Sequence, residues 1–327
     1  MQSTITTAHG SGGTATSRLI ADVFMRYFHN EINAKMADAA ILNIEGKLAF
    51  TTDSFVVKPL FFPGGDIGRL SICGTVNDLL TAGAAPRYIS AGFILEEGLP
   101  LDTLHRVCRS MSETAKEANI SIVTGDTKVI EGNGGMYINT SGIGTLQNAA
   151  ISFDTAQQGD AIIVTGNLGD HHACILSQRL SLNNTIQSDA APLNGILEAL
   201  TSNQLNLHGI RDITRGGLAT VLNEIAEATG LSPVIEEIKV PVAEDVAALC
   251  KILGLDPLYM GNEGKLVLLV PQEQAAMAVA AIKKAPYGKN AAVIGTLEAQ
   301  AGVRVRTRLG GVRMLAALQG EGLPRIC

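Results

Sequence analysis

The sequence predicts a two-domain α/β protein whose first domain is α+β in character. Its 327 residues are more than one ordinary domain needs. Hydrophobic residues make up 46% of the chain and charged residues 17%, so there is ample material for two buried cores. Segments with strand-like and helix-like periodicity alternate along the chain, and a polar stretch at 147–150 divides them into two sets. We therefore expect domains at 1–148 and 149–319, followed by a flexible tail at 320–327.

The first domain is expected to begin with a helix. Apolar residues recur at helical spacing, among them Leu19, Val23 and Phe28, and predict a helix over 16–32 with one buried face. The remaining periodic segments predict strands at 47–57, 87–97, 121–130 and 135–146, and helices at 70–82 and 101–118.

The second domain shows the same alternation. Its periodic segments predict strands at 160–166, 264–270, 291–297 and 303–315, and helices at 170–180 and 214–229. Within the last extended segment, Gly310 and Gly311 separate two basic and apolar runs, a pattern that is typical of a hairpin turn.

Charge and targeting signals narrow the classes of partner. The formal net charge is -6, from 25 Lys+Arg and 31 Asp+Glu, and no basic run occurs, so nucleic acid and anionic membranes are poor candidates. The first seven residues lack the basic start and apolar stretch of a leader, and no apolar run reaches membrane-spanning length. We expect a soluble, cytoplasmic protein.

The chain has five cysteines, and the last of them is its final residue. They are odd in number, widely spaced and never in a C-x-x-C pair, so they predict neither a disulfide framework nor a zinc site. Four of them lie among apolar neighbours and are expected to be buried. Cys327 ends a short arm of eight residues that can span roughly 26 to 29 Å. A thiol there can be loaded by one partner and unloaded to another, although a frayed end is the simpler interpretation.

Four aspartates lie beside small residues, and we expect each of them in a turn or at a strand end: Asp53, Asp78, Asp126 and Asp212. Carboxylates that converge can hold Mg²⁺ and bridge it to the oxygens of a triphosphate. Nearby glycines allow the backbone to approach phosphates closely. Any one of these aspartates is explained as well by a turn or a helix cap. Four in similar settings favour a magnesium–nucleotide site.

The common nucleotide-binding signatures are absent from the sequence. Gly264-Lys265 is followed by Leu266, so it does not complete a P-loop. The glycine-rich start at 9–13 has no strand before it, so it does not support a Rossmann motif. A lid over phosphates and an ordinary mobile N-terminus both remain open for that segment.

Seven short motifs follow one another along the chain: AHGSGG at 8–13, FPGGDIG at 62–68, GTVNDL at 74–79, GDTKV at 125–129, RDITRGGL at 211–218, NEGKL at 262–266 and PRIC at 324–327. In this order they resemble the HypE family of hydrogenase maturation carbamoyl dehydratases, in the PurM-like superfamily related to aminoimidazole ribotide synthetase. The similarity runs nearly end to end. Gly261 and His172 depart from the expected Ala and Gly, so His171 and His172 receive no role.

The resemblance implies a fold and a reaction. The fold is the two-domain PurM-like fold, in which the N-terminal sheets of two chains pair into a dimeric β-barrel. A HypF carbamoyltransferase would place a carbamoyl group on Cys327. The protein would then use ATP to dehydrate this S-carboxamide to an S-cyanate. The HypC–HypD complex would accept the cyanide, which becomes a ligand of the iron of NiFe-hydrogenase.

The resemblance also implies roles for individual residues. The four aspartates would hold Mg²⁺ and orient the triphosphate, with Asn77 and Asn262 supporting the nucleotide. Lys128 would neutralise charge that develops on the carboxamide oxygen or the γ-phosphate, and Glu263 would accept the proton from nitrogen. From the residues alone, a surface ion pair is the better explanation of Lys128 and Glu263.

Two other classes of function stay open. A PurM-like kinase or ligase that acts on a free small molecule would share the aspartates and would not need the tail. Selenophosphate synthetases usually carry a reactive Cys or selenocysteine near the N-terminus, whereas no Cys precedes Cys73 here. The other class is a non-catalytic assembly module whose tail docks on a partner.

Overall fold

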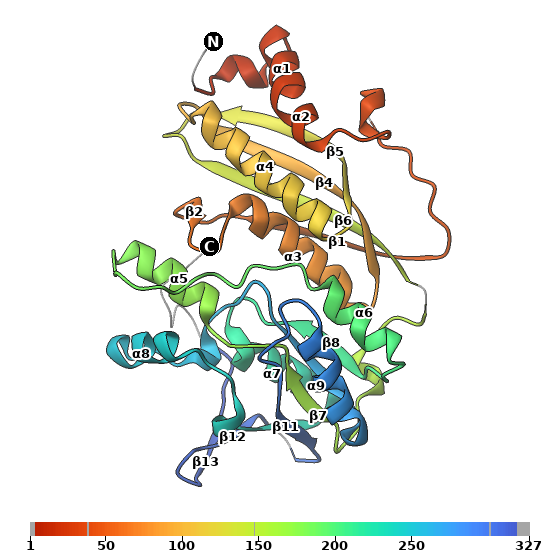
Figure 1. The fold of residues 1–327 in the computed structure, drawn as a ribbon, viewed down its shortest axis with the longest axis vertical. Helices are drawn as coiled ribbons and strands as arrows, with labels where there is room; N and C mark the ends of the chain where they lie inside the picture. The colour runs from red at the N-terminus through yellow and green to blue at the C-terminus, as the bar shows by residue number, and fades with distance from the viewer. Residues whose placement is uncertain (1–3, 38, 147, 301, 319–327) are drawn as a thin grey trace.

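The computed structural model describes residues 4–37, 39–146, 148–300 and 302–318. In Figure 1 these residues form two parts, one above the other, each with a sheet and helices packed against it. One sheet is built from residues 47–146 and the other from 161–314, which confirms the α/β organisation in two parts. Within the described ranges, no helix is long and apolar enough to cross a membrane. The tail at 320–327, with Cys327, lies outside the described residues.

The N-terminal sheet has four strands in the order β1-β6-β4-β5. Their bounds match the predicted segments closely: β1 Lys47–Phe55, β4 Ala85–Glu96, β5 Ser121–Ile130 and β6 Met136–Leu146. The pair β4 and β5 is parallel, and the other neighbours are antiparallel. Helices α3 (Ile67–Thr81) and α4 (Leu101–Glu117) pack against one face of this sheet (Figure 1). A short hairpin, β2 (Phe61–Phe62) with β3 (Gly65–Asp66), precedes α3.

The helix expected over 16–32 is interrupted and ends early. It consists of α1 (Thr14–Leu19), a π-helical turn (Ile20–Phe24) and α2 (Met25–Phe28). Asn30 and Asn33 explain the end, because both donate their side-chain amides to the carbonyl oxygen of the last helical residue, at 3.0 and 2.6 Å. These bonds satisfy a carbonyl that another helical turn would otherwise have used.

The C-terminal sheet has seven strands in the order β13-β12-β9-β11-β7-β10-β8. Their bounds are β7 Ala161–Val164, β8 Gly209–Asp212, β9 Ser232–Glu236, β10 Leu266–Val270, β11 Ala292–Glu298, β12 Arg304–Arg306 and β13 Val312–Met314. The helices of this part are α5 Asp170–Arg179, α6 Asn194–Ser202, α7 Gly217–Thr229, α8 Glu244–Leu253 and α9 Ala275–Lys284. The antiparallel pair β12 and β13 confirms the predicted hairpin.

Helix α3 lies between the two parts and positions the site. It packs against β1 and β6 on one side and against β8 and α6 on the other, so its side chains are buried nearly all the way round. Glycines allow this close packing. A Cβ atom at Gly68 would lie 2.5 Å from the carbonyl oxygen of Val107, and one at Gly74 would lie 2.8 Å from the ring of Phe55. Residues on α3 therefore face both domains at fixed distances.

Candidate functional site

A cleft of about 340 Å³ opens where β1 and α3 of the first domain meet the second domain. Its second-domain wall comes from the end of β8, the turn that follows it, the first half of α7 and the loop before β10. The charged and acidic groups that line it are Asp53, Asp78, Arg211, Asp212, Arg215, Glu224 and Glu263. The cleft thus brings together three of the four predicted aspartates and the predicted base.

Each acidic residue reaches the cleft from a different element. Asp53 lies within β1, at a position that alternates with the outward-facing Thr52 and Ser54. Asp78 lies within α3 and accepts a hydrogen bond from the Thr51 hydroxyl at 2.8 Å. Asp212 is the last residue of β8.

The turn or strand-end setting expected for the four aspartates is therefore wrong for three of them. Asp53 and Asp126 lie inside strands and Asp78 lies in a helix, because the small residues that suggested turns serve close packing instead. Only Asp212 stands at the end of a strand.

The cleft carboxyls repel one another. Burial raises the pKa of Asp78 to about 6, and the charges of Asp212 and Asp53 add to the shift. Burial also raises the pKa of Asp212, with a further contribution from Asp53. The pKa of Glu263 lies well above its ordinary value because of burial and the nearby charges of Asp189, Asp212 and Asp53. Such a cluster is favourable for binding a cation.

The residues of the cleft fit a magnesium–nucleotide complex better than a bare metal. Among the described residues, no group of three or more His, Cys, Asp or Glu side chains is placed to hold a metal ion. Mg²⁺ commonly binds to one or two carboxylates together with phosphate oxygens, so a complete protein cage is not required. Arg211 and Arg215 supply positive charge on the same wall.

Asp126 and Lys128 do not line this cleft. They form an ion pair at 3.0 Å on β5, with side chains that are 69% and 66% exposed. Their cross-strand neighbours on β4 are Gly92 and Ile94. The side chains of Asp126 and Lys128 therefore point to the open face of the sheet, away from α3 and α4. The bond from Lys128 lowers the pKa of Asp126. Within one chain, the structure separates this pair from the other predicted site residues.

The glycine-rich start packs beside that pair. A Cβ atom at Gly10 would lie 2.9 Å from the main-chain nitrogen of Val129, the residue after Lys128. The N-terminal segment and β5 therefore form a second region of interest, apart from the acidic cleft.

Asn77 and Asn262 are both buried, and their side chains bond to protein main chain. Asn77 accepts from the Leu193 nitrogen at 3.0 Å and donates to the carbonyl oxygens of Ala191 and, more weakly at 3.4 Å, Glu263. Asn262 accepts from the Gly169 nitrogen at 2.8 Å and donates to the carbonyl oxygen of Ile213 at 3.0 Å. Both residues fix the segments around Glu263.

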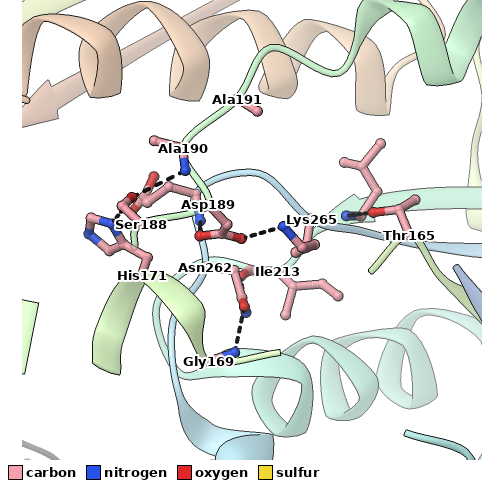
Figure 2. Close-up of polar contacts among 12 residues, drawn as sticks. Thr165, Gly169, His171, Ser188, Asp189, Ala190, Ala191, Ile213, Asn262 and Lys265 are labelled. Carbon is pink, nitrogen blue, oxygen red and sulfur yellow. Dashed lines mark hydrogen bonds and ion pairs between the residues drawn. The ribbon is translucent and has the colours of Figure 1, made fainter. Parts of the chain in front are cut away.

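Asp189 and Lys265 form a buried ion pair behind the cleft, with 2.9 Å between Oδ2 and Nζ (Figure 2). Asp189 also accepts a hydrogen bond from the main-chain nitrogen of Glu263 at 3.1 Å. Sequence reasoning missed both residues. The NEGKL motif could have pointed to Lys265, whereas Asp189 lies in a segment without periodicity.

His171 and His172 lie at the start of α5 and are both buried. Burial lowers the pKa of each to about 4, so both imidazoles are neutral near pH 7. His171 Nδ1 is hydrogen-bonded to the Ser188 hydroxyl at 2.8 Å, as Figure 2 shows, and its ring meets Phe62 edge-on. His171 therefore joins the two domains through packing.

Comparison with known proteins identifies close relatives. Two family models match the chain: AIR synthase related protein, N-terminal domain, over residues 36–146, and AIR synthase related protein, C-terminal domain, over residues 157–308. "Carbamoyl dehydratase HypE" of Rhodobacter capsulatus is 47% identical over 99% of this chain and 98% of that protein. A crystal structure of hydrogenase maturation protein HypE in complex with ATP has a TM-score of 0.94 and 49% identity, covering 98% of this chain and 99% of that chain. A chain from the crystal structure of a HypE–HypF complex has a TM-score of 0.81 and 44% identity, covering 92% and 99%.

Proposed function

The chain belongs to the HypE family of carbamoyl dehydratases, and we propose that its interdomain cleft is where ATP drives the dehydration of a carbamoylated Cys327. It is an ATP-binding carbamoyl dehydratase that acts in the synthesis of the cyanide ligands of NiFe-hydrogenase. The observation that carries the proposed site is the convergence of Asp53, Asp78, Asp212 and Glu263 on one cleft between the domains.

The chemistry requires that the amide oxygen become a better leaving group. Transfer of the γ-phosphate of ATP to the oxygen of the S-carboxamide gives ADP and an O-phosphorylated intermediate, and the nitrogen releases the first of its two protons. The C–O bond then breaks as the nitrogen loses its remaining proton, and a carbon–nitrogen triple bond forms. The oxygen leaves within inorganic phosphate. The balance is one S-carboxamide and one ATP in, and one S-cyanate, one ADP, one hydrogen phosphate and one proton out.

The residues of the cleft have separate roles in this reaction. Glu263 accepts the nitrogen proton, and a base with a raised pKa accepts protons readily once it is ionised. Asp53, Asp78 and Asp212 would hold Mg²⁺, which supplies charge compensation for the triphosphate when bound. Asn77 and Asn262 support the nucleotide indirectly, because their side chains fix the cleft wall.

We further propose a homodimer that forms through the open face of the N-terminal sheet. Apolar side chains stand exposed on that face, including Leu48, Phe50 and Ile94, with Phe50 70% exposed. An apolar sheet face of this kind is typical of an interface. Asp126 and Lys128 stand on the same face, so in a β-barrel dimer they would act on a nucleotide bound by the partner subunit. In this arrangement both residues would take the roles that the resemblance implies.

Membership of the family implies two partners, a HypF carbamoyltransferase and a HypC–HypD complex. The HypF partner loads the carbamoyl group, a pairing that the solved complex of a relative supports. The HypC–HypD complex takes the cyanide. We place the protein in the cytoplasm, where a reducing environment keeps a free thiol available.

The test is the intact mass of the C-terminal peptide after incubation with HypF, a carbamoyl donor and ATP. The wild-type peptide should gain a carbamoyl group and then lose one water. Cys327→Ala should bind ATP and show neither change, and Glu263→Gln should gain the carbamoyl group and lose water at least about 10²-fold more slowly. Dehydration in a Cys327→Ala protein would overturn the carrier role. Normal water loss in Glu263→Gln would remove Glu263 as the base.

A further inference from the structure

We propose that Asp189 is a positioning residue for Glu263, with Lys265 as its counter-ion. Asp189 holds the main chain of the 263–265 segment from behind the cleft and so fixes where the Glu263 carboxyl points. This inference rests on the proposed role of Glu263 as the base.

The Asp189 side chain accepts hydrogen bonds from two residues of the segment. Asp189 Oδ1 accepts from the Glu263 nitrogen at 3.1 Å, and Oδ2 accepts from Lys265 Nζ at 2.9 Å. Gly264 lies between them and packs on the Asp189 carbonyl, where an added Cβ would come within 1.9 Å of the oxygen. Three consecutive residues are thus held by a single aspartate, which leaves Glu263 little freedom at its main chain.

The segment that carries Asp189 is tied to the other domain. Arg69 of α3 donates Nε to the Ala190 carbonyl at 2.7 Å, and Asn77 of α3 bonds to Ala191 and Leu193. The same helix carries Asp78. Asp189 therefore fixes Glu263 relative to the cleft carboxylate of the first domain, and not only within its own domain.

Charge explains why an aspartate suits this position. Asp189 and Lys265 are 3% and 8% exposed, and the nearby Lys265 ammonium offsets the effect of burial and keeps the pKa of Asp189 below its ordinary value. A buried ion pair generally adds little net stability over a well-packed apolar pair. What an ionised carboxylate does add is a strong, directional acceptor for the Glu263 N–H. The Asp189–Lys265 pair therefore serves mainly to fix the geometry of the Glu263 segment, and it adds little to the stability of the fold.

The test compares two double variants that both remove the buried charges. In Asp189→Asn with Lys265→Met, an oxygen remains to accept from the Glu263 nitrogen. In Asp189→Leu with Lys265→Met, the oxygen is gone. We expect the Leu–Met variant to convert the carbamoylated peptide to the cyanated one about 10²-fold more slowly, because a small misplacement of a catalytic group has that effect. The Asn–Met variant should recover most of the rate, and both should bind ATP like the wild type.

A double-mutant cycle that combines the Leu–Met changes with Glu263→Gln distinguishes a positioning role of Asp189 from a general structural role. If Asp189 acts through Glu263, the Leu–Met changes should slow dehydration less than about threefold further in a Glu263→Gln background. Full additivity, or equal rates in the two double variants, would overturn the positioning role while leaving Glu263 as the base. Normal dehydration in Glu263→Gln alone would instead overturn both proposals together. Thermal unfolding of each variant verifies that the comparison is made on folded protein.

Discussion

The acidic side chains that line the cleft and Asp189 behind it are in opposite electrostatic environments. Asp53, Asp78 and Asp212 line the cleft, and none of them forms an ion pair with another described residue. Their pKa shifts, where resolved, are upward. Asp189 is buried close by, is paired with Lys265, and has a lowered pKa. The same residue type therefore serves as a binding group at one place and as a fixed support at the other.

The difference shows where the molecule gives up stability for function. Carboxylates that are buried without a cation, and that also repel one another, weaken the folded state until a cation compensates them. A buried carboxylate that is paired and hydrogen-bonded carries no such excess charge. Substitutions should therefore have effects of opposite sign in the two places, and each prediction below tests that contrast.

The largest effect is expected from removing one half of the buried pair. Lys265→Met leaves the Asp189 carboxylate buried without its cation, which should lower the free energy of unfolding by about 3 to 5 kcal/mol. Urea denaturation near pH 7 measures the loss. The matched control is Lys265→Met combined with Asp189→Asn, which removes both charges and should recover most of the stability. Equal losses in the single and double variants would show that the packing of Lys265, and not its charge, is what matters.

Most of the fold could be predicted from the sequence, because periodic segments show their secondary structure in the spacing of their apolar residues. Strands such as β6 alternate, and α4 has a clear apolar face, so both were placed within a residue or two. The helix α9, with the sequence AAMAVAAIKK, is alanine-rich and has no contrast between faces, and β9 is short and contains a proline. Neither segment was predicted, because alanine favours a helix but gives no apolar periodicity, and a proline argues against a strand.

The site was only partly predictable for a related reason. Alternation along β5 shows that Asp126 and Lys128 share a face, but it does not reveal which face the helices cover. Only the pairing of β5 with β4 puts them on the open side. Asp189 had no local signal at all, since its importance arises from contacts with residues more than seventy positions away in the sequence.

An intermediate effect of opposite sign is expected at Asp78. Its folded pKa of about 6 lies above the ordinary value of 3.8, so the folded state loses stability as the pH rises from about 4 to about 6. Asp78→Asn removes this loss and keeps an oxygen for Thr51. Without nucleotide, it should raise the free energy of unfolding at pH 7.5 by on the order of 2 kcal/mol and leave it unchanged below pH 4. Dehydration of the carbamoylated tail should fall sharply in the same variant.

The control for Asp78 is Asp126→Asn. Both substitutions remove one aspartate charge, but the pKa of Asp126 is lowered by Lys128, so Asp126→Asn should give no gain in stability at pH 7.5. Urea denaturation at several pH values separates the two variants. A gain of the same size in both would mean that net charge, and not the cleft, sets the effect.

The smallest effect on stability is expected at the exposed pair on β5. Lys128→Met should change the free energy of unfolding by less than about 1 kcal/mol, because ion pairs between such exposed side chains contribute little. If Lys128 serves a nucleotide bound by the partner subunit, the same variant should still lose most of its dehydration activity. Mixing Lys128→Met with Glu263→Gln chains tests this directly, because a mixed dimer would contain one site with both residues intact. Recovery of activity on mixing supports action across the interface, whereas two inactive proteins that stay inactive together, despite verified exchange of subunits, would place both residues in the site of one chain.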